Sequence, residues 1–152
     1  MLLSSDKLGE CLTKNDANQE VDDQVDHPEG HAGPEQRFEQ VHVAKELGAE
    51  AIELHTGEYA NARGEGRSHE LARLLAMARL GSEIGLEVHA GHGLTYQNVG
   101  PVAAIPEIVE LNIGHSIISR AIYVGLRQAV ADMRSLMDQA RTDARLNLIA
   151  TQ

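Results

Sequence analysis

Three short stretches of this chain carry polar side chains next to glycine. They are residues 53–57 (Glu-Leu-His-Thr-Gly), 89–96 (His-Ala-Gly-His-Gly-Leu-Thr-Tyr) and 112–115 (Asn-Ile-Gly-His). An imidazole titrates near neutral pH, which suits histidine to general acid–base catalysis. Glycine allows the backbone to come close to a ligand. The three stretches are therefore the candidates for a functional site.

His92 stands between two glycines, so its imidazole is expected to be exposed in a loop that a ligand can approach closely. This arrangement suits general acid–base chemistry, and the alternative is a loop histidine without a chemical role. A metal site is disfavoured. His89 and His92 are three residues apart, but they lie on either side of a strand end rather than on one helix face, and no cysteine accompanies them.

Gly114 precedes a predicted helix start, where free backbone amides and the helix dipole favour an anion such as phosphate. The equally acceptable alternative is a glycine needed only for a tight turn between strand and helix. Glu53 is expected on the polar face of a strand, where burial without a partner would be costly. It is either a carboxylate with a role in catalysis or one half of an ion pair, and the second is commoner for a lone glutamate.

Strands and helices alternate from residue 36 onward. Phe38, Val41, Ala44 and Leu47 recur at helical spacing before Gly48, which predicts a helix that ends there. Strands are predicted at residues 51–55, 86–90 and 110–113, and further helices at about 68–84 and 97–105. A last helical region opens at residues 114–116, with one apolar face formed by Ile122, Leu126, Ala129, Met133 and Met137.

This alternation predicts an α/β fold with parallel strands joined by helices. Each strand carries aliphatic residues on one face and polar residues on the other, such as Glu53 with His55 and Glu87 with His89. A doubly wound sheet would bury both faces in aliphatic side chains. The polar face therefore favours a (β/α) TIM barrel, although a complete one takes about 250 residues. We predict a partial barrel of about three β-α units.

Composition and charge restrict the function classes. The 152 residues carry a formal net charge of -10 and have no Trp and a single Phe, which argues against nucleic-acid binding. No apolar run is long enough to span a membrane, and residues 1–5 do not resemble a secretory signal. The single cysteine, Cys11, is compatible with a reducing compartment, so a cytoplasmic location is predicted.

Residues 1–35 differ from the rest of the chain. They contain nine acidic residues against Lys7 and Lys14, and few large aliphatic side chains. Such a segment buries too little apolar surface to offset the entropy lost on ordering, so it is predicted to be disordered. The expected organisation is a polar acidic segment at 1–35, a barrel-like part at 36–142 and a C-terminal tail at 143–152.

Taken together, the motifs resemble a known family. The similar segments are residues 52–57 (Ile-Glu-Leu-His-Thr-Gly), 90–96 (Ala-Gly-His-Gly-Leu-Thr-Tyr), 105–107 (Ile-Pro-Glu) and 110–115 (Glu-Leu-Asn-Ile-Gly-His). In residues, order and spacing they are similar to pyridoxine 5'-phosphate synthase of vitamin B6 biosynthesis. The resemblance covers about residues 36–141 and corresponds to the C-terminal part of that family's barrel.

The resemblance implies a (β/α)8 TIM barrel that condenses 1-deoxy-D-xylulose 5-phosphate with 3-amino-2-oxopropyl phosphate. The products are pyridoxine 5'-phosphate, phosphate and water, and no metal or organic cofactor is implied. By motif, His92 would be the proton donor and Glu53 would stabilise charge during ring closure. Gly93 would belong to the substrate loop, while Gly114 and His115 would bind substrate phosphate.

The resemblance also implies a homo-oligomer, since the family is octameric, and no nucleic-acid or membrane partner. Because it covers about the last three strands of the barrel, the family's other catalytic groups have no counterpart in these residues. We therefore expect a truncated form that is inactive alone. The alternative is a non-catalytic fragment that assembles with a complementary or full-length synthase chain.

Overall fold

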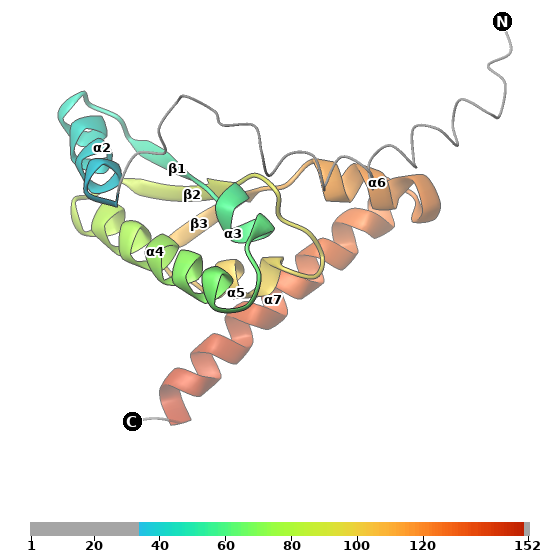
Figure 1. Ribbon diagram of the computed structural model, residues 1–152. Helices are drawn as coiled ribbons and strands as arrows, with labels where there is room; N and C mark the ends of the chain where they lie inside the picture. The colour runs from blue at the N-terminus through green and yellow to red at the C-terminus, as the bar shows by residue number, and fades with distance from the viewer. Residues whose placement is uncertain (1–33, 151–152) are drawn as a thin grey trace, which may run out of the picture. The chain divides into compact units, whose positions relative to one another are not determined.

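The computed structural model of this protein describes residues 34–150. They form a three-stranded sheet with connecting helices (Figure 1). In chain order the elements are α2 (Pro34–Glu46), β1 (Ala51–His55), α3 (Gly57–Asn61), α4 (Gly64–Glu83), β2 (Glu87–Gly91), α5 (Val99–Ala103), β3 (Ile108–Asn112), α6 (His115–Val124) and α7 (Leu126–Ala150). The predicted alternation of strands and helices is confirmed.

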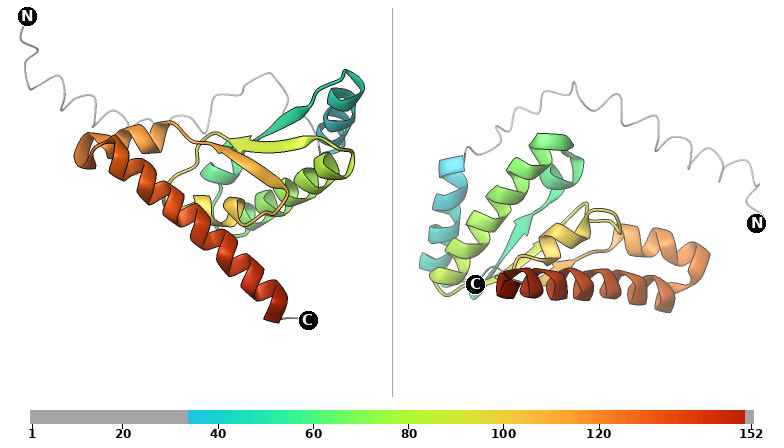
Figure 2. Two further views of the ribbon diagram at one scale, coloured as in Figure 1. Left: turned by 180° about the vertical axis from the view of Figure 1, so that it is seen from behind. Right: turned by 90° about the horizontal axis from the view of Figure 1, so that it is seen from below.

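The three strands pair in parallel in the order β1-β2-β3, so their carboxyl ends lie at the same edge of the sheet. Helices α4, α5 and α7 lie against one face of the sheet, as Figures 1 and 2 show from opposite sides. Two apolar clusters fill this interface. The larger contains Leu74 and Ala78 from α4 with Val88 and Ile108 from the sheet, all at most 1% exposed.

The smaller cluster joins α7 to the rest of the fold. Met133 packs against Val99 and Ala103 of α5, and all three side chains are at most 2% exposed. The opposite face of the sheet is polar. Its exposed side chains include Glu53, His55, Glu87, Glu110 and Asn112. The predicted division into an apolar and a polar face is thus confirmed, and the described residues form an α/β fold compatible with part of a TIM-like barrel.

Strand β3 contains an irregularity that the alternating pattern did not predict. Ile108 pairs with Val88, but the next residue of β2, His89, pairs with Glu110, so Val109 is an additional residue. Such a bulge changes which face the following side chains occupy. Ile108 is buried, whereas Glu110 and Asn112 lie on the polar face. The guanidinium of Arg141 donates hydrogen bonds to the carbonyls of Pro106 and Ile108 at the start of this strand.

Several predicted bounds were wrong. The last helical region is two helices, because Gly125 adopts a φ of 83° between α6 and α7. The single apolar face is therefore interrupted: Ile122 is 79% and Leu126 57% exposed, while Ala129 and Met133 are buried. The short helix α3 was not predicted. Helix α4 begins four residues before the predicted start, and β3 begins two residues earlier than expected.

The predictions for the two terminal segments, residues 1–35 and 143–152, can be compared with the structure only in part. The segment predicted to be disordered lies outside the described residues, except that Pro34 and Glu35 form the start of α2. Proline at a first helical position is favourable because its missing N–H would have no partner there. Residues 143–150 continue helix α7. Among the described helices, none has the length and apolar character needed to cross a bilayer. The cytoplasmic location stays a prediction.

The packing of α4 on the sheet gives a stability prediction. Leu74 is fully buried, so the Leu74→Ala variant should lose about 2–5 kcal/mol of unfolding free energy through lost burial and the cavity created. Urea unfolding followed by circular dichroism measures this loss. Leu47→Ala is the matched control, since Leu47 is 83% exposed and should change stability little. Equal effects of the two variants would contradict the described core.

Candidate active site

The polar residues singled out by sequence meet at the carboxyl edge of the sheet. A pocket of about 410 Å³ is lined by Glu53, His92, Gly93, Gly114 and His115, together with Leu94, Asn112 and Ile113. These residues come from the middle of β1, the loop after β2, the end of β3 and the start of α6. The structure therefore brings the five predicted site residues into one pocket.

Glu53 is bound by a residue two strands away. Its Oε2 accepts a hydrogen bond of 2.7 Å from Asn112 Nδ2, and this contact passes from β1 to β3 over β2. Gly91 makes the crossing possible. A Cβ at position 91 would lie 2.6 Å from Glu53 Oε1 and 2.9 Å from the Asn112 carbonyl. Glu53 is thus held by an amide, and within residues 34–150 it does not form the ion pair favoured for a lone glutamate.

His92 is fixed through its backbone. Thr56, which is fully buried, places its hydroxyl 2.6 Å from the Gly91 carbonyl and 2.5 Å from the His92 carbonyl. The Thr56 amide also donates to the Gly91 carbonyl at 2.7 Å. His92 has a φ of 81°, a left-handed conformation that costs energy for a residue with a Cβ. The contacts of Thr56 are well placed to hold this conformation.

The His92 imidazole stacks on the imidazole of His55, with ring centroids 4.5 Å apart. Gly57 provides the room for both rings, because a Cβ there would lie 2.5 Å from His55 Cε1 and 3.2 Å from His92 Cδ2. The ring of His92 therefore lies at the end of β2 with one side covered by His55. It remains exposed to the pocket and to solvent.

The loop after His92 is held by its own polar residues. The Asn98 side chain accepts a hydrogen bond from the Thr95 amide at 2.7 Å and donates to the Gly93 carbonyl at 3.3 Å. Ser116, in the first turn of α6, donates to the Leu94 carbonyl at 2.8 Å. The loop and the helix that would bind an anion are therefore connected directly.

Gly114 and His115 form the start of α6, a helix of ten residues. Gly114 has a φ of -107°, and a Cβ placed on it would meet nothing within 4 Å. The tight-turn alternative is therefore not what the backbone requires, since a larger residue would fit. The glycine leaves open space in front of the helix start, where backbone amides attract anions.

His89 lies on the polar face of β2 and does not line the pocket. Its Nε2 is 2.8 Å from Glu87 Oε1, and its Nδ1 is 3.9 Å from Glu110 Oε1. The hydrogen bond to Glu87 raises the pKa of His89 above the usual 6.5, with smaller contributions from the charges of Glu110 and Glu53 and an opposing effect of burial. Among residues 34–150, no group of three or more potential ligands is arranged to hold a metal ion.

Comparison with known proteins decides the family. Residues 34–139 match the model of the family described as pyridoxal phosphate biosynthesis protein PdxJ. The chain belongs to this family. The pyridoxine 5'-phosphate synthase of Roseobacter denitrificans is 57% identical over 106 residues, which are 67% of this chain and 43% of that enzyme. The synthases of Sulfurihydrogenibium sp. and Zymomonas mobilis are 53% and 50% identical over 70% and 72% of this chain.

The chain spans about 43% of the length of these PdxJ relatives. The resemblance seen in the motifs is confirmed. Three contributors to the site were missed by sequence reasoning: Asn112 as the partner of Glu53, Thr56 as the anchor of His92, and His55 as its stacking partner. His55 had been placed on the polar face of the sheet, and Asn112 lies in one of the three candidate stretches, so a signal for both was present. Nothing in the sequence indicated that the Thr56 hydroxyl reaches two carbonyls of another strand.

The anchoring of the PdxJ loop by Thr56 is testable. The Thr56→Val variant keeps the shape but removes the buried hydroxyl, so unfolding free energy should fall by about 1–3 kcal/mol. Hydrogen exchange of the amides in residues 91–93 should also become faster. Thr142→Val is the matched control, because the Thr142 hydroxyl binds the Asp138 carbonyl on the exposed surface of α7. A neutral effect of Thr56→Val would contradict the anchoring role.

The Glu87–His89 pair gives a prediction on pH. Because the folded state raises the pKa of His89, the pair stabilises the fold below pH 6.5, and this contribution is lost as the pH rises through the raised pKa. Glu87→Gln should move the pKa of His89 down toward 6.5, measured by NMR titration of its imidazole. Glu83→Gln, on the exposed end of α4, should leave the titration unchanged. If the pKa of His89 in the Glu87→Gln variant equals that of the wild-type protein, the pair does not cause the raised pKa.

Proposed function

We propose that this chain forms the C-terminal part of the active site of a pyridoxine 5'-phosphate synthase. The reaction would condense 1-deoxy-D-xylulose 5-phosphate with 3-amino-2-oxopropyl phosphate to pyridoxine 5'-phosphate, phosphate and water. The observation that supports this most directly is the shared pocket. Glu53, His92, Gly93, Gly114 and His115, to which the family resemblance assigns roles, line it together.

The geometry suits a distinct task for each group. His92 is an exposed imidazole held by its backbone, which suits a proton donor during condensation and water loss. Glu53, oriented by Asn112, would place negative charge beside the positive charge that develops during ring closure. Gly93 would let the loop approach the substrate. Gly114 and His115, at the start of α6, would bind a substrate phosphate through backbone amides and the imidazole.

The complete fold that this function needs is proposed to be the (β/α)8 barrel. In support, the polar sheet face carries the site, as the inward face of such a barrel does at its carboxyl end. Strands β1 and β3 are edges of the described sheet and offer unpaired backbone groups. Since further strands would have to complete the pocket, the 152 residues alone are expected to be inactive.

A second candidate function is assembly with another chain, favoured by exposed apolar groups. Helix α6 has no buried residue. The exposed apolar side chains on α6 and the beginning of α7 are Ile118, Ile122, Tyr123, Val124, Leu126 and Val130. Under this proposal the chain associates with copies of itself, as an octameric family would, or with a complementary synthase segment that pairs at the open strand edges.

A chimera tests the catalytic proposal. In the Roseobacter denitrificans synthase, the 106 matching residues are replaced by the corresponding residues of this chain, and formation of pyridoxine 5'-phosphate is measured from both substrates. The chimera should be active. His92→Asn in the chimera should reduce the rate by about 100- to 10,000-fold, because a general acid contributes that much.

His69→Asn is the matched control, since the His69 side chain is 79% exposed and lies outside the pocket. A folded chimera without activity, or an active His92→Asn chimera, would refute the catalytic proposal. The 152-residue chain is assayed in parallel, alone and mixed with the remaining part of the relative. Recovery of activity only in the mixture would support assembly, and sedimentation velocity reports whether the chain alone self-associates.

A further inference from the structure

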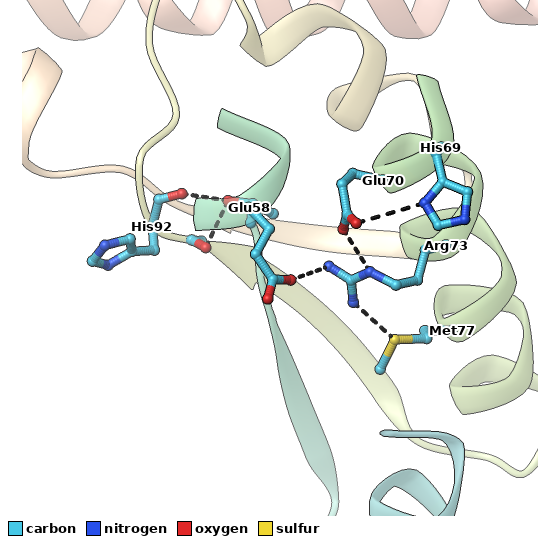
Figure 3. Close-up of polar contacts among 8 residues, drawn as sticks. Glu58, His69, Glu70, Arg73, Met77 and His92 are labelled. Carbon is cyan, nitrogen blue, oxygen red and sulfur yellow. Dashed lines mark hydrogen bonds and ion pairs between the residues drawn. The ribbon is translucent and has the colours of Figure 1, made fainter. Parts of the chain in front are cut away.

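Arg73 is a charged residue that the proposed reaction does not use, yet it is one of the best-enclosed charges of the described fold. Its side chain is 12% exposed. Its Nη2 lies 2.8 Å from Glu58 Oε2, its Nε lies 2.6 Å from Glu70 Oε2, and its Nη1 is 3.4 Å from Met77 Sδ. Figure 3 shows the guanidinium between the two carboxylates. Such a charge is rarely buried without partners of this kind.

The contact with Glu58 differs from the other two because it leaves the helix. Glu70 and Met77 belong to α4, as Arg73 does, whereas Glu58 is in the first turn of α3. Helix α3 has only five residues, too few to be stable without tertiary contacts. Other residues hold α3 as well: the Tyr59 hydroxyl binds the Asn98 carbonyl, and Arg67 binds the carbonyl of Ala62, directly after the helix. Arg73 acts on the first turn.

The first turn of α3 is continuous with the residues that hold His92. Thr56 directly precedes α3 and binds the carbonyls of Gly91 and His92. Gly57, the first residue of α3, packs against the imidazole of His92. A displacement of this turn would therefore move the anchor of the His92 backbone and the surface under its ring together. Figure 3 shows His92 on one side of α3 and Arg73 on the other.

His92 needs such an anchor because of its backbone conformation. A φ of 81° in a residue with a Cβ is unfavourable and persists only where the surroundings determine it. The hydrogen bonds of Asn98 and Ser116 hold the loop beyond His92, at Gly93, Leu94 and Thr95. The His92 carbonyl itself is bound by Thr56.

We propose that Arg73 is a positioning residue for His92, acting through the Glu58 carboxylate, the first turn of α3 and the Thr56 anchor. The significance of this for catalysis rests on the proposed function. The positional coupling itself does not, because it is a property of the 152-residue chain without substrate.

Hydrogen exchange of the Thr56 amide, measured by NMR on the intact chain, tests the coupling, because this amide binds the Gly91 carbonyl. Arg73→Met should make the exchange about tenfold faster, since Glu58 in the first turn of α3 loses the contact with this guanidinium. Glu58→Gln keeps the shape of the side chain. It should make exchange of the Thr56 amide at least about threefold faster while the protein stays folded. The imidazole resonances of His92 should shift in both variants. Arg73→Lys, which keeps the charge, should restore part of the wild-type behaviour.

Two controls separate positioning from general support of α4. Glu70→Gln removes the partner of Arg73 that lies within α4, and it should leave Thr56 exchange and the His92 resonances near wild type. Arg134→Met removes a matched exposed pair with Asp138 on α7 and should have no effect. The double variant of Arg73→Met and Glu58→Gln should be no worse than the stronger single variant.

Unchanged Thr56 exchange and His92 resonances in folded Glu58→Gln would overturn the proposal. An effect of Glu70→Gln as large as that of Glu58→Gln would do the same, because Arg73 would then only stabilise α4. The chimera adds an independent measurement: Glu58→Gln there should lower kcat more than it changes KM. An inactive chimera with the predicted exchange behaviour would refute the proposed function and leave the coupling supported.

Discussion

The pocket of this protein depends on the hydrogen bonds that Thr56 makes to Gly91 and His92. They connect the end of β1 to the end of β2, beyond the last regular pairing of the two strands. Because Thr56 is fully buried, its single hydroxyl proton is shared between two carbonyls with no competition from water. This connection fixes the His92 backbone beside the start of α3, while Asn98 and Ser116 hold the loop that follows.

The same edge of the sheet shows how small residues organise a polar site. Gly91 allows Glu53 and Asn112 to meet across the central strand, and Gly57 allows two imidazoles to stack. In both places a methyl group would occupy space that a functional side chain now uses. Gly114 differs, since its environment would accept a Cβ. Its absent side chain keeps the start of α6 open, and packing does not require a glycine there.

Much of this arrangement follows from periodicity. Alternation in residues 51–55 and 86–90 predicts two strands with a polar face, and their parallel pairing brings Glu53, His92 and Gly114 to one edge. Periodicity does not predict local irregularities of the backbone or contacts between residues far apart in the sequence. Strict alternation places Ile108, Glu110 and Asn112 on one face, whereas the bulge at Val109 separates the first from the other two. Gly125 divides α6 from α7 because its positive φ ends a helix that the apolar spacing would continue. The Arg73–Glu58 contact joins residues 15 apart and leaves no pattern in the sequence.

The irregular start of β3 has a consequence for what can join this sheet. An ordinary edge strand presents an even row of donors and acceptors, and any extended segment can pair with it. Here the additional residue Val109 interrupts that row, and Arg141 already binds the carbonyls of Pro106 and Ile108. A strand that pairs along β3 must therefore match one interrupted register and reach past a guanidinium. The bulge and the guanidinium thus restrict which extended segments can pair along β3.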